Sequence, residues 1–381
     1  MKRRLFLITH CLALVIIAAI SGNQNTSSAR EPQGQQDPQL TREDEDARGV
    51  PGLGRRKGKM VIANRASGTI SVIDAASDRV VGTYALPADT KTPEPMYVVY
   101  SRGRVFVGDR ANNRVAVFNP RTFVVEGTVP AGAGIWHMWA DPFDRQLWVN
   151  NDIDKTCTVI DPLTLQVLAT VPTPADLASA GGKPHDVILD PVAGEFAYVS
   201  LIGVTGPADF VVKYSTQTFQ EVGRVAVGKD PHLTATRRNN LLYVPCQNSN
   251  VVAVLDRGTL APVTSILIPG AHGAGMAYDG ETFYTTNLPG GGNDGLWTID
   301  TNSNAVIGSP LDTPFPGPHN IALSPDRGIF FPNDRGGRKL YLTHSGATAS
   351  KVTVYKLKGD LPVYHKEITV GFNPFGLAYV P

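Results

Sequence analysis

The stretch at residues 240–267, NLLYVPCQNSNVVAVLDRGTLAPVTSIL, contains the pattern that decides the fold. A short apolar strand around LYV is followed by VVAVLD, a segment rich in β-branched residues. Its counterpart TISVID at residues 69–74 alternates apolar and polar positions, as a strand packed between neighbouring sheets does. Turn residues then lead into a last strand. The stretch therefore predicts three short strands joined by tight turns.

The same pattern occurs in seven copies between residue 59 and the C-terminus. Four histidines that follow Pro or Ala, His185, His232, His272 and His319, are separated by 47, 40 and 47 residues. This is the period of a propeller blade. No segment has the pattern of an amphipathic helix, so we predict an all-β, seven-bladed β-propeller with four-stranded blades. Two stretches depart from the repeat: SLIGVTGPAD at residues 200–209 and an insertion, DRGIFFPNDRGGRK, at residues 326–339.

The two ends of the repeat region predict how the ring closes. The C-terminal NPFGLAYVP at residues 373–381 matches GPHNIALSP at residues 317–325, the start of an inner strand. The first copy, KMVIAN at residues 59–64, has no such segment before it. We therefore expect the C-terminal strand to complete the first blade, which removes open sheet edges.

The composition agrees with many short strands and excludes two kinds of partner. The chain of 381 residues contains 38 Gly and 29 Pro, which tight turns require. Its 35 basic and 34 acidic side chains give a formal charge of +1, without the positive surplus that binds nucleic acid or an anionic membrane. We expect a monomer that binds a small molecule, a peptide or a protein.

The N-terminus predicts export. A basic start with Lys2, Arg3 and Arg4 precedes an apolar run at residues 5–20, as in a secretory signal peptide. We assign residues 1–29 to the signal, residues 30–58, rich in charge, Gln, Pro and Gly, to a disordered linker, and residues 59–381 to the propeller. A periplasmic or extracellular location follows. Cys157 and Cys246 fall in different copies and are expected to be buried free thiols.

The LYV strands, the VSVID-like strands and the PHNIALSPD segment resemble the YVTN-type, YncE-like seven-bladed β-propeller repeat family. The resemblance covers residues 59–381. It extends to the propellers of quinoprotein amine dehydrogenase heavy chains, nitrous oxide reductase and lactonase-type enzymes. It implies the fold and leaves the function open, because one propeller scaffold carries enzymes, receptors and binding modules.

The first residues of the seven inner strands define the candidate site. In a propeller these residues converge from every blade on one mouth of the central channel. Five of the eight histidines of the chain fall there. The predicted ligand-binding ring is Met96, His137, His185, His232, His272, His319 and Phe375, with Trp136 as the alternative to His137.

Two interpretations of this ring remain open. Imidazole is a common ligand of copper, zinc, iron and nickel, so His185, His232, His272 and His319 could hold a metal, copper being the expected ion, with His137 or Met96 completing the site. Alternatively, a histidine after Pro stabilises the tight loop between blades, independently in each blade. We therefore expect a binding module, with a copper-dependent oxidoreductase as the first alternative and a lactonase-type hydrolase as the second. The hydrolase lacks a nominated acidic residue at the ring.

A second ring is expected where the LYV strands end. These positions suit polar residues that satisfy backbone groups in turns, and Cys246 with His344 is the pair there that could form a nucleophile or a metal site, without a third partner. The ring comprises Asn64, Asp109, Asn151, Leu201, Cys246, Asn287 and His344.

Overall fold

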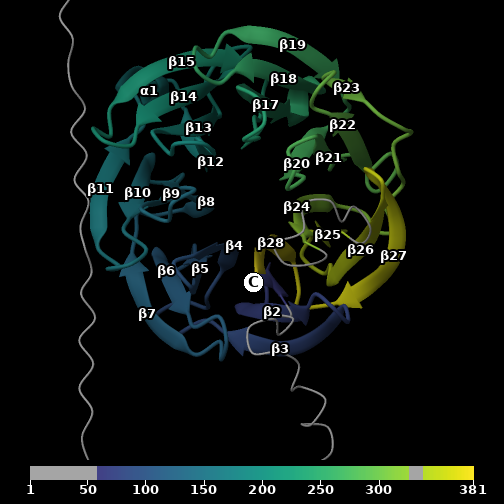
Figure 1. Cartoon of the computed structure of the whole chain (residues 1–381). Coiled ribbons are helices and arrows are strands. Elements are labelled where there is room, and N and C mark those ends of the chain that lie inside the picture. Colours follow the sequence, from purple (N-terminus) through teal and green to yellow (C-terminus); the bar gives the residue numbers. More distant parts are fainter. Residues whose placement is uncertain (1–57, 326–337) are drawn as a thin grey trace, which may run out of the picture. The chain divides into compact units, whose positions relative to one another are not determined.

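The computed structural model describes residues 58–325 and 338–381, which belong to one compact unit, Arg55–Pro381. The predicted signal peptide, almost all of the predicted linker and most of the insertion at residues 326–339 lie outside the described residues. The described part forms seven four-stranded antiparallel sheets placed around a common axis (Figure 1). The predicted all-β seven-bladed propeller is confirmed. No helix in the described residues has the length and apolar character that crossing a membrane requires.

Each blade is ordered from the axis outward, with its inner strand nearest the centre (Figure 1). Blade 1 contains β28 (Pro374–Val380), β1 (Lys59–Asn64), β2 (Thr69–Asp74) and β3 (Arg79–Ala85), and blade 2 contains β4 (Pro95–Ser101), β5 (Arg104–Asp109), β6 (Arg114–Phe118) and β7 (Val125–Pro130). Blade 3 contains β8 (Ile135–Ala140), β9 (Leu147–Asn151), β10 (Thr156–Ile160) and β11 (Val167–Pro172), and blade 4 contains β12 (Lys183–Leu189), β13 (Phe196–Ile202), β14 (Asp209–Ser215) and β15 (Glu221–Val227).

The remaining three blades have the same order. Blade 5 contains β16 (Thr234–Ala235), β17 (Leu241–Cys246), β18 (Val251–Asp256) and β19 (Pro262–Leu267), and blade 6 contains β20 (Ala271–Met276), β21 (Thr282–Asn287), β22 (Leu296–Asp300) and β23 (Ala305–Val306). Blade 7 contains β24 (Pro318–Ser324), β25 (Lys339–His344), β26 (Lys351–Lys358) and β27 (Leu361–Thr369).

The C-terminal strand closes the ring as predicted. Strand β28 pairs antiparallel with β1, with Val380 opposite Lys59 and Leu377 opposite Ile62. Blade 1 therefore combines the two ends of the repeat region in one sheet. Because every blade then has a neighbour on both sides, the faces of the second strands are covered on both sides; β5 and β17, for example, are buried from their second residue onward. Outer strands such as β15 alternate in exposure instead.

Tyrosines on the second strands of blades 4 to 7 join each blade to the next. Each hydroxyl donates a hydrogen bond to the turn between the third and fourth strands of the following blade, and such a bond contributes about 1 kcal/mol net. The pairs are Tyr198 with Arg257 O (2.8 Å), Tyr243 with Thr301 O (3.2 Å), Tyr284 with Asp360 O (2.8 Å) and, closing the ring, Tyr341 with the carboxylate of Asp78.

The connection between blades 3 and 4 contains a helix that the sequence did not predict. The helix α1 (Ala175–Ser179) lies between β11 and β12, and its Leu177 packs in the same hydrophobic cluster as Val204. Val204 belongs to the atypical stretch at residues 200–209, in the loop between β13 and β14, and Thr205 N–H of that loop donates to Ala180 O at 2.8 Å. One buried leucine in a single turn is too short for a helical periodicity to be visible.

Candidate functional site

In six of the seven blades an irregularity in the inner strand turns two consecutive residues out of the regular ladder, and in blade 5 the ladder is interrupted at the same place without a change of register. In blade 4 the pairing with β13 passes from Pro184 opposite Leu201 to Val187 opposite Val199, and His185 and Asp186 lie between these pairs. In blade 7 it passes from Pro318 to Ile321. Such bulges re-aim side chains that would otherwise alternate between faces. The pairs in blades 1 to 7 are Phe375 and Gly376, Met96 and Tyr97, Trp136 and His137, His185 and Asp186, His232 and Leu233, His272 and Gly273, and His319 and Asn320.

The five predicted histidines converge at the axis. All five are buried, and the exposed fraction of each residue is at most 7%. Consecutive rings are in contact around an arc. The centroid distances are 5.1 Å from His137 to His185, 4.6 Å from His185 to His232, 3.9 Å from His232 to His272, and 4.7 Å from His272 to His319.

The other predicted ring residues divide between the axis and the core. Phe375 continues the arc at 4.2 Å from His319, and Trp136 contacts Phe375 at 5.7 Å and His185 at 5.8 Å. Trp136 thus occupies the first bulge position of blade 3 and His137 the second. Met96 packs in a hydrophobic cluster that includes Phe106 and Ile135, and its neighbour Tyr97 contacts His137 at 3.8 Å.

Three of the histidines have the spacing of a metal site. Among the described residues, one nitrogen each of His137, His185 and His232 can be chosen so that all lie within 4.8 Å of one another. Several imidazole nitrogens are buried without a hydrogen-bond partner in the described part: Nδ1 of His185, Nε2 of His232 and both nitrogens of His272. An unpaired buried polar atom costs stability, so each of these needs an occupant or a functional reason.

Asp186 is a buried carboxylate that sequence reasoning did not nominate. Its Oδ1 lies 2.8 Å from Nδ1 of His137, and its Oδ2 accepts a 2.8 Å hydrogen bond from Leu233 N and lies 3.9 Å from Nδ1 of His232. One carboxylate on blade 4 therefore contacts the histidines of blades 3 and 5. It assigns the proton of His137 to Nδ1, which leaves Nε2 as the nitrogen with a free electron pair.

An amide occupies the corresponding position in blade 7. Asn320 Nδ2 donates to Phe375 O at 3.3 Å and lies 2.8 Å from Nδ1 of His319, and its Oδ1 lies 3.3 Å from the hydroxyl of Tyr97. The same hydroxyl lies 2.6 Å from Nε2 of His137. The hydroxyl of Tyr97 therefore lies between Asn320 and His137, whose other nitrogen bonds Asp186.

Burial lowers the pKa and favours the neutral form of four of the five imidazoles, those of His185, His232, His272 and His319. Burial, followed by the nearby His137, lowers the pKa of His185 to about 3, and burial lowers the pKa of His319 to about 3. The pKa values of His232 and His272 are also lowered, first by burial and then by neighbouring histidines. Neutral imidazoles retain the electron pair that a metal requires.

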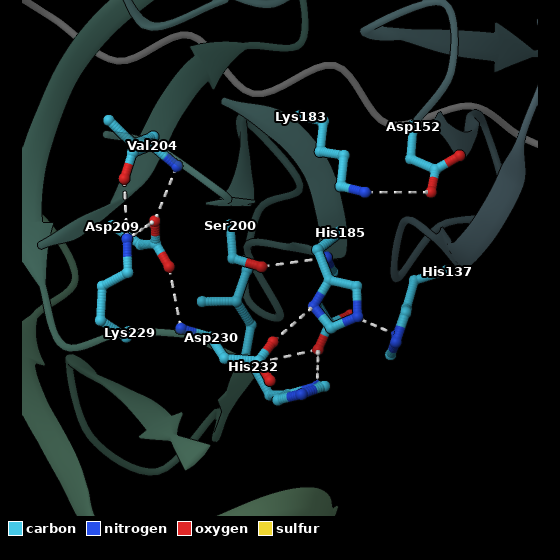
Figure 2. A network of polar contacts seen from close by, with 12 residues as sticks. His137, Asp152, Lys183, His185, Ser200, Val204, Asp209, Lys229, Asp230 and His232 are labelled. Carbon is cyan, nitrogen blue, oxygen red and sulfur yellow. Dashed lines mark hydrogen bonds and ion pairs between the residues drawn. The ribbon is translucent and has the colours of Figure 1, made fainter. Parts of the chain in front are cut away.

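Charged side chains surround this end of the inner strands in balanced pairs. Arg65 bonds Glu94 at 2.6 Å, and Arg110 bonds Asp152 at 3.0 Å. Lys183 lies 3.9 Å from Asp152, and Asp230 lies 3.7 Å from Nδ1 of His185 (Figure 2).

The second predicted ring consists mainly of structural residues. Asn64 and Asn151 donate to Ser71 and Thr158 of the adjacent strands, both at 2.9 Å, and Asp109 accepts from Glu94 N. His344 bonds Thr353 and Pro316 O, and Cys246 bonds Val244 O. Both cysteines of the described part, Cys157 and Cys246, are buried and free, and burial raises the pKa of Cys246 to about 12. A thiol this far from ionisation is a poor nucleophile.

Comparisons with known proteins show the fold and leave the activity open. No family model and no curated protein matches the chain. Hydrazine synthase of Kuenenia stuttgartiensis is similar at 17% identity with a TM-score of 0.60, covering 76% of this chain and 90% of that one. A functionally unknown protein of Desulfotomaculum acetoxidans is similar at 13% identity with a TM-score of 0.62, covering 84% and 98%.

A third similar structure is a Bacteroides uniformis protein assigned provisionally as a 6-phosphogluconolactonase, at 17% identity with a TM-score of 0.61, covering 85% of this chain and 100% of that one. At these identities the likeness concerns the fold alone. The fold and the site together define a seven-bladed β-propeller with a cluster of buried histidines at its axis.

Proposed function

We propose that the protein is an exported metal-binding propeller that holds a copper ion at its axis, with His137, His185 and His232 as ligands. The observation that carries this proposal is the set of three buried imidazole nitrogens, all within 4.8 Å of one another. We also propose that the chain belongs to the YVTN-type repeat family. Export is inferred from the N-terminal sequence alone.

The three imidazoles are ligands of the type that a transition metal binds, and their nitrogens lie somewhat farther apart than in a metal-bound site. Two nitrogens bound tetrahedrally to one ion at about 2.0–2.1 Å lie about 3.3–3.4 Å apart. The three rings would therefore have to move inward by an ångström or so from the 4.8 Å limit. Imidazole suits copper, zinc, iron and nickel, and copper binds most strongly among the divalent ions of this series, so copper is the expected ion.

The surroundings also support a metal. His272 contacts His232 at 3.9 Å and has two unpaired nitrogens, so it is available as a fourth ligand. Asp186 holds Nδ1 of His137, the arrangement in which a carboxylate orients a metal-binding histidine. Nε2 of His137 is bonded to Tyr97 at 2.6 Å, and a metal at that nitrogen would displace the hydroxyl.

The test is metal content and affinity in the exported protein. We expect one equivalent of copper after dialysis, and loss of more than a hundredfold in affinity in the double variant His185→Ala plus His232→Ala. His365→Ala is the matched control, because His365 lies on the outer strand β27 with 34% of its side chain exposed. Absence of stoichiometric metal from the parent under copper-replete conditions would reject the metal site.

A hydrolase is the second candidate. It is supported by Asp186, which lies 2.8 Å from Nδ1 of His137 and makes an acidic residue available beside an imidazole general base. In this case metal-free protein should hydrolyse a lactone, and Asp186→Asn should abolish the turnover. Turnover that requires added copper, or oxidation of a substrate, would instead support the copper-dependent oxidoreductase.

A further inference from the structure

One side of the axis carries hydrogen-bond donors without acceptors. The indole Nε1 of Trp136 is buried and has no partner among the described residues, although the ring itself is partly exposed. An indole nitrogen can only donate. A buried N–H of this kind is stabilised by a ligand that accepts.

His319 presents a second donor, which follows from how Asn320 is fixed. Asn320 Nδ2 contacts Phe375 O at 3.3 Å, and a carbonyl oxygen can only accept, so the amide nitrogen must face that side. The same NH2 group donates to Nδ1 of His319 at 2.8 Å. A neutral imidazole that accepts at Nδ1 carries its proton on Nε2. Among the described residues the hydrogen bond of this ring is made at Nδ1, which leaves the Nε2–H available, although Nε2 is not fully buried as Trp136 Nε1 is.

The two donors flank the same aromatic ring. Phe375 contacts His319 at 4.2 Å and Trp136 at 5.7 Å. The guanidinium of Arg65 lies over both Phe375 (5.3 Å) and Trp136 (5.5 Å), and that of Arg110 lies 4.7 Å from Trp136. Both arginines are paired with carboxylates, so the two uncommitted N–H groups, rather than a charge surplus, define what could bind.

We infer that this side of the axis binds a small oxyanion, such as a carboxylate or phosphate, through Trp136 Nε1–H and His319 Nε2–H. The inference goes beyond the proposed metal site and does not require it. Because His272 lies between His319 and His232 in the arc, a bound oxyanion would be a near neighbour of the proposed metal. The axis would then combine a cation subsite with an anion subsite.

The test uses the four tryptophans of the full-length exported protein kept in chelator. Acetate and phosphate are titrated separately at constant ionic strength, with chloride as the reference, and the indole N–H signals are followed by NMR. We expect a saturable shift of the Trp136 signal with at least one oxyanion. The internal controls are Trp148, bonded to Gln146 at 2.9 Å, and Trp297, bonded to Asp294 O at 2.7 Å, whose signals should stay in place.

Two variants make the test specific. Trp136→Phe keeps a ring on Phe375 and removes the donor together with its NMR signal, so the affinities of this variant and of the parent are compared by isothermal titration calorimetry. The affinity for the oxyanion should fall about tenfold to a hundredfold, as expected for a hydrogen bond to a charged group. Trp297→Phe is the matched control and should bind like the parent. The absence of any saturable shift with either oxyanion, or unchanged affinity in Trp136→Phe, would overturn the inference. A shift that requires added copper would overturn the two-donor assignment while supporting the metal site.

Discussion

The two sides of the propeller axis use the same strand positions to present opposite chemistry. In blade 4 His185 is followed by Asp186, and in blade 7 His319 is followed by Asn320, each pair within the same bulge. The carboxylate accepts a hydrogen bond from His137 Nδ1–H, which leaves the electron pair at Nε2, whereas the amide donates a hydrogen bond to His319 Nδ1, which leaves an N–H at Nε2. The residue after the histidine, rather than the histidine, therefore decides whether the axis attracts a cation or an anion.

Lowering the pH should destabilise the folded protein through the histidines on both sides of the axis, and this is the largest effect we expect. The unfolded chain binds protons at histidine near pH 6.5, whereas the folded-state pKa values of His185 and His319 are about 3. Between these values the unfolded state binds more protons, so the free energy of unfolding falls as the pH is lowered from 6.5 towards 3. At pH 5 each such histidine contributes about 2 kcal/mol of destabilisation.

Urea unfolding of metal-free protein at pH 7.5 and pH 5 measures this effect. His185→Gln and His319→Gln should each reduce the difference in unfolding free energy between the two pH values, while His365→Gln, on the outer strand β27, should reduce it less, because burial lowers the pKa of His365 as well but its side chain is 34% exposed. If only one of the two axis variants reduced this difference, burial would lower the pKa of the histidine on that side of the axis only.

Replacement of the carboxylate is expected to weaken the cation side specifically. Asp186→Asn removes the acceptor that holds the proton of His137 at Nδ1, so affinity for copper should fall about tenfold to a hundredfold. Asp230→Asn is the matched control, because Asp230 lies 3.7 Å from His185, beyond hydrogen-bond distance, and its effect should be smaller. Competition with a copper chelator gives the affinities. Equal losses in both variants would indicate a general effect of charge.

The reciprocal change should convert the anion side towards the cation side. In Asn320→Asp the new carboxylate cannot donate to His319 Nδ1, so the imidazole proton moves to Nδ1 and Nε2 gains a free electron pair. Oxyanion affinity should fall about tenfold, as for a lost hydrogen bond to a charged group. Histidine ¹⁵N shifts report the tautomer directly. Unchanged shifts at His319 would mean that the amide does not set its proton.

The convergence of the histidines could be predicted because it depends on the repeat. Four of the five follow Pro or Ala at the same point of a repeated unit, and a closed ring brings equivalent points together. The closing strand was predictable for the same reason, since residues 373–381 match another inner strand in sequence. Periodicity and turn chemistry therefore suffice for the fold and for the location of the site.

The residues that orient the histidines could not be found by the same reasoning. In a regular strand, successive side chains point to opposite faces, so a strand that aims the predicted ring residues at the axis would aim Asp186, Asn320 and Tyr97 away from it. The bulges in blades 2, 4 and 7 bring these three residues towards it. A usable signal was present, because a charged or amide residue directly follows His185 and His319 in strands that are otherwise apolar. The choice of metal is not encoded in this way, since imidazole ligands suit several ions.

Tyr97 is the contact between the two sides, and its removal should have the smallest effect. Tyr97→Phe keeps the ring on His137 and Phe375 but removes the hydroxyl that contacts His137 Nε2 at 2.6 Å and Asn320 Oδ1 at 3.3 Å. Stability should fall by about 1 kcal/mol. Copper affinity should rise a few-fold, because the metal no longer has to displace the hydroxyl from Nε2. Tyr84→Phe is the control, because it also removes a hydroxyl from a stacked tyrosine, whose ring lies 5.1 Å from that of Phe123. A loss of copper affinity in Tyr97→Phe would instead make the phenol part of the metal site and remove the boundary between the two sides.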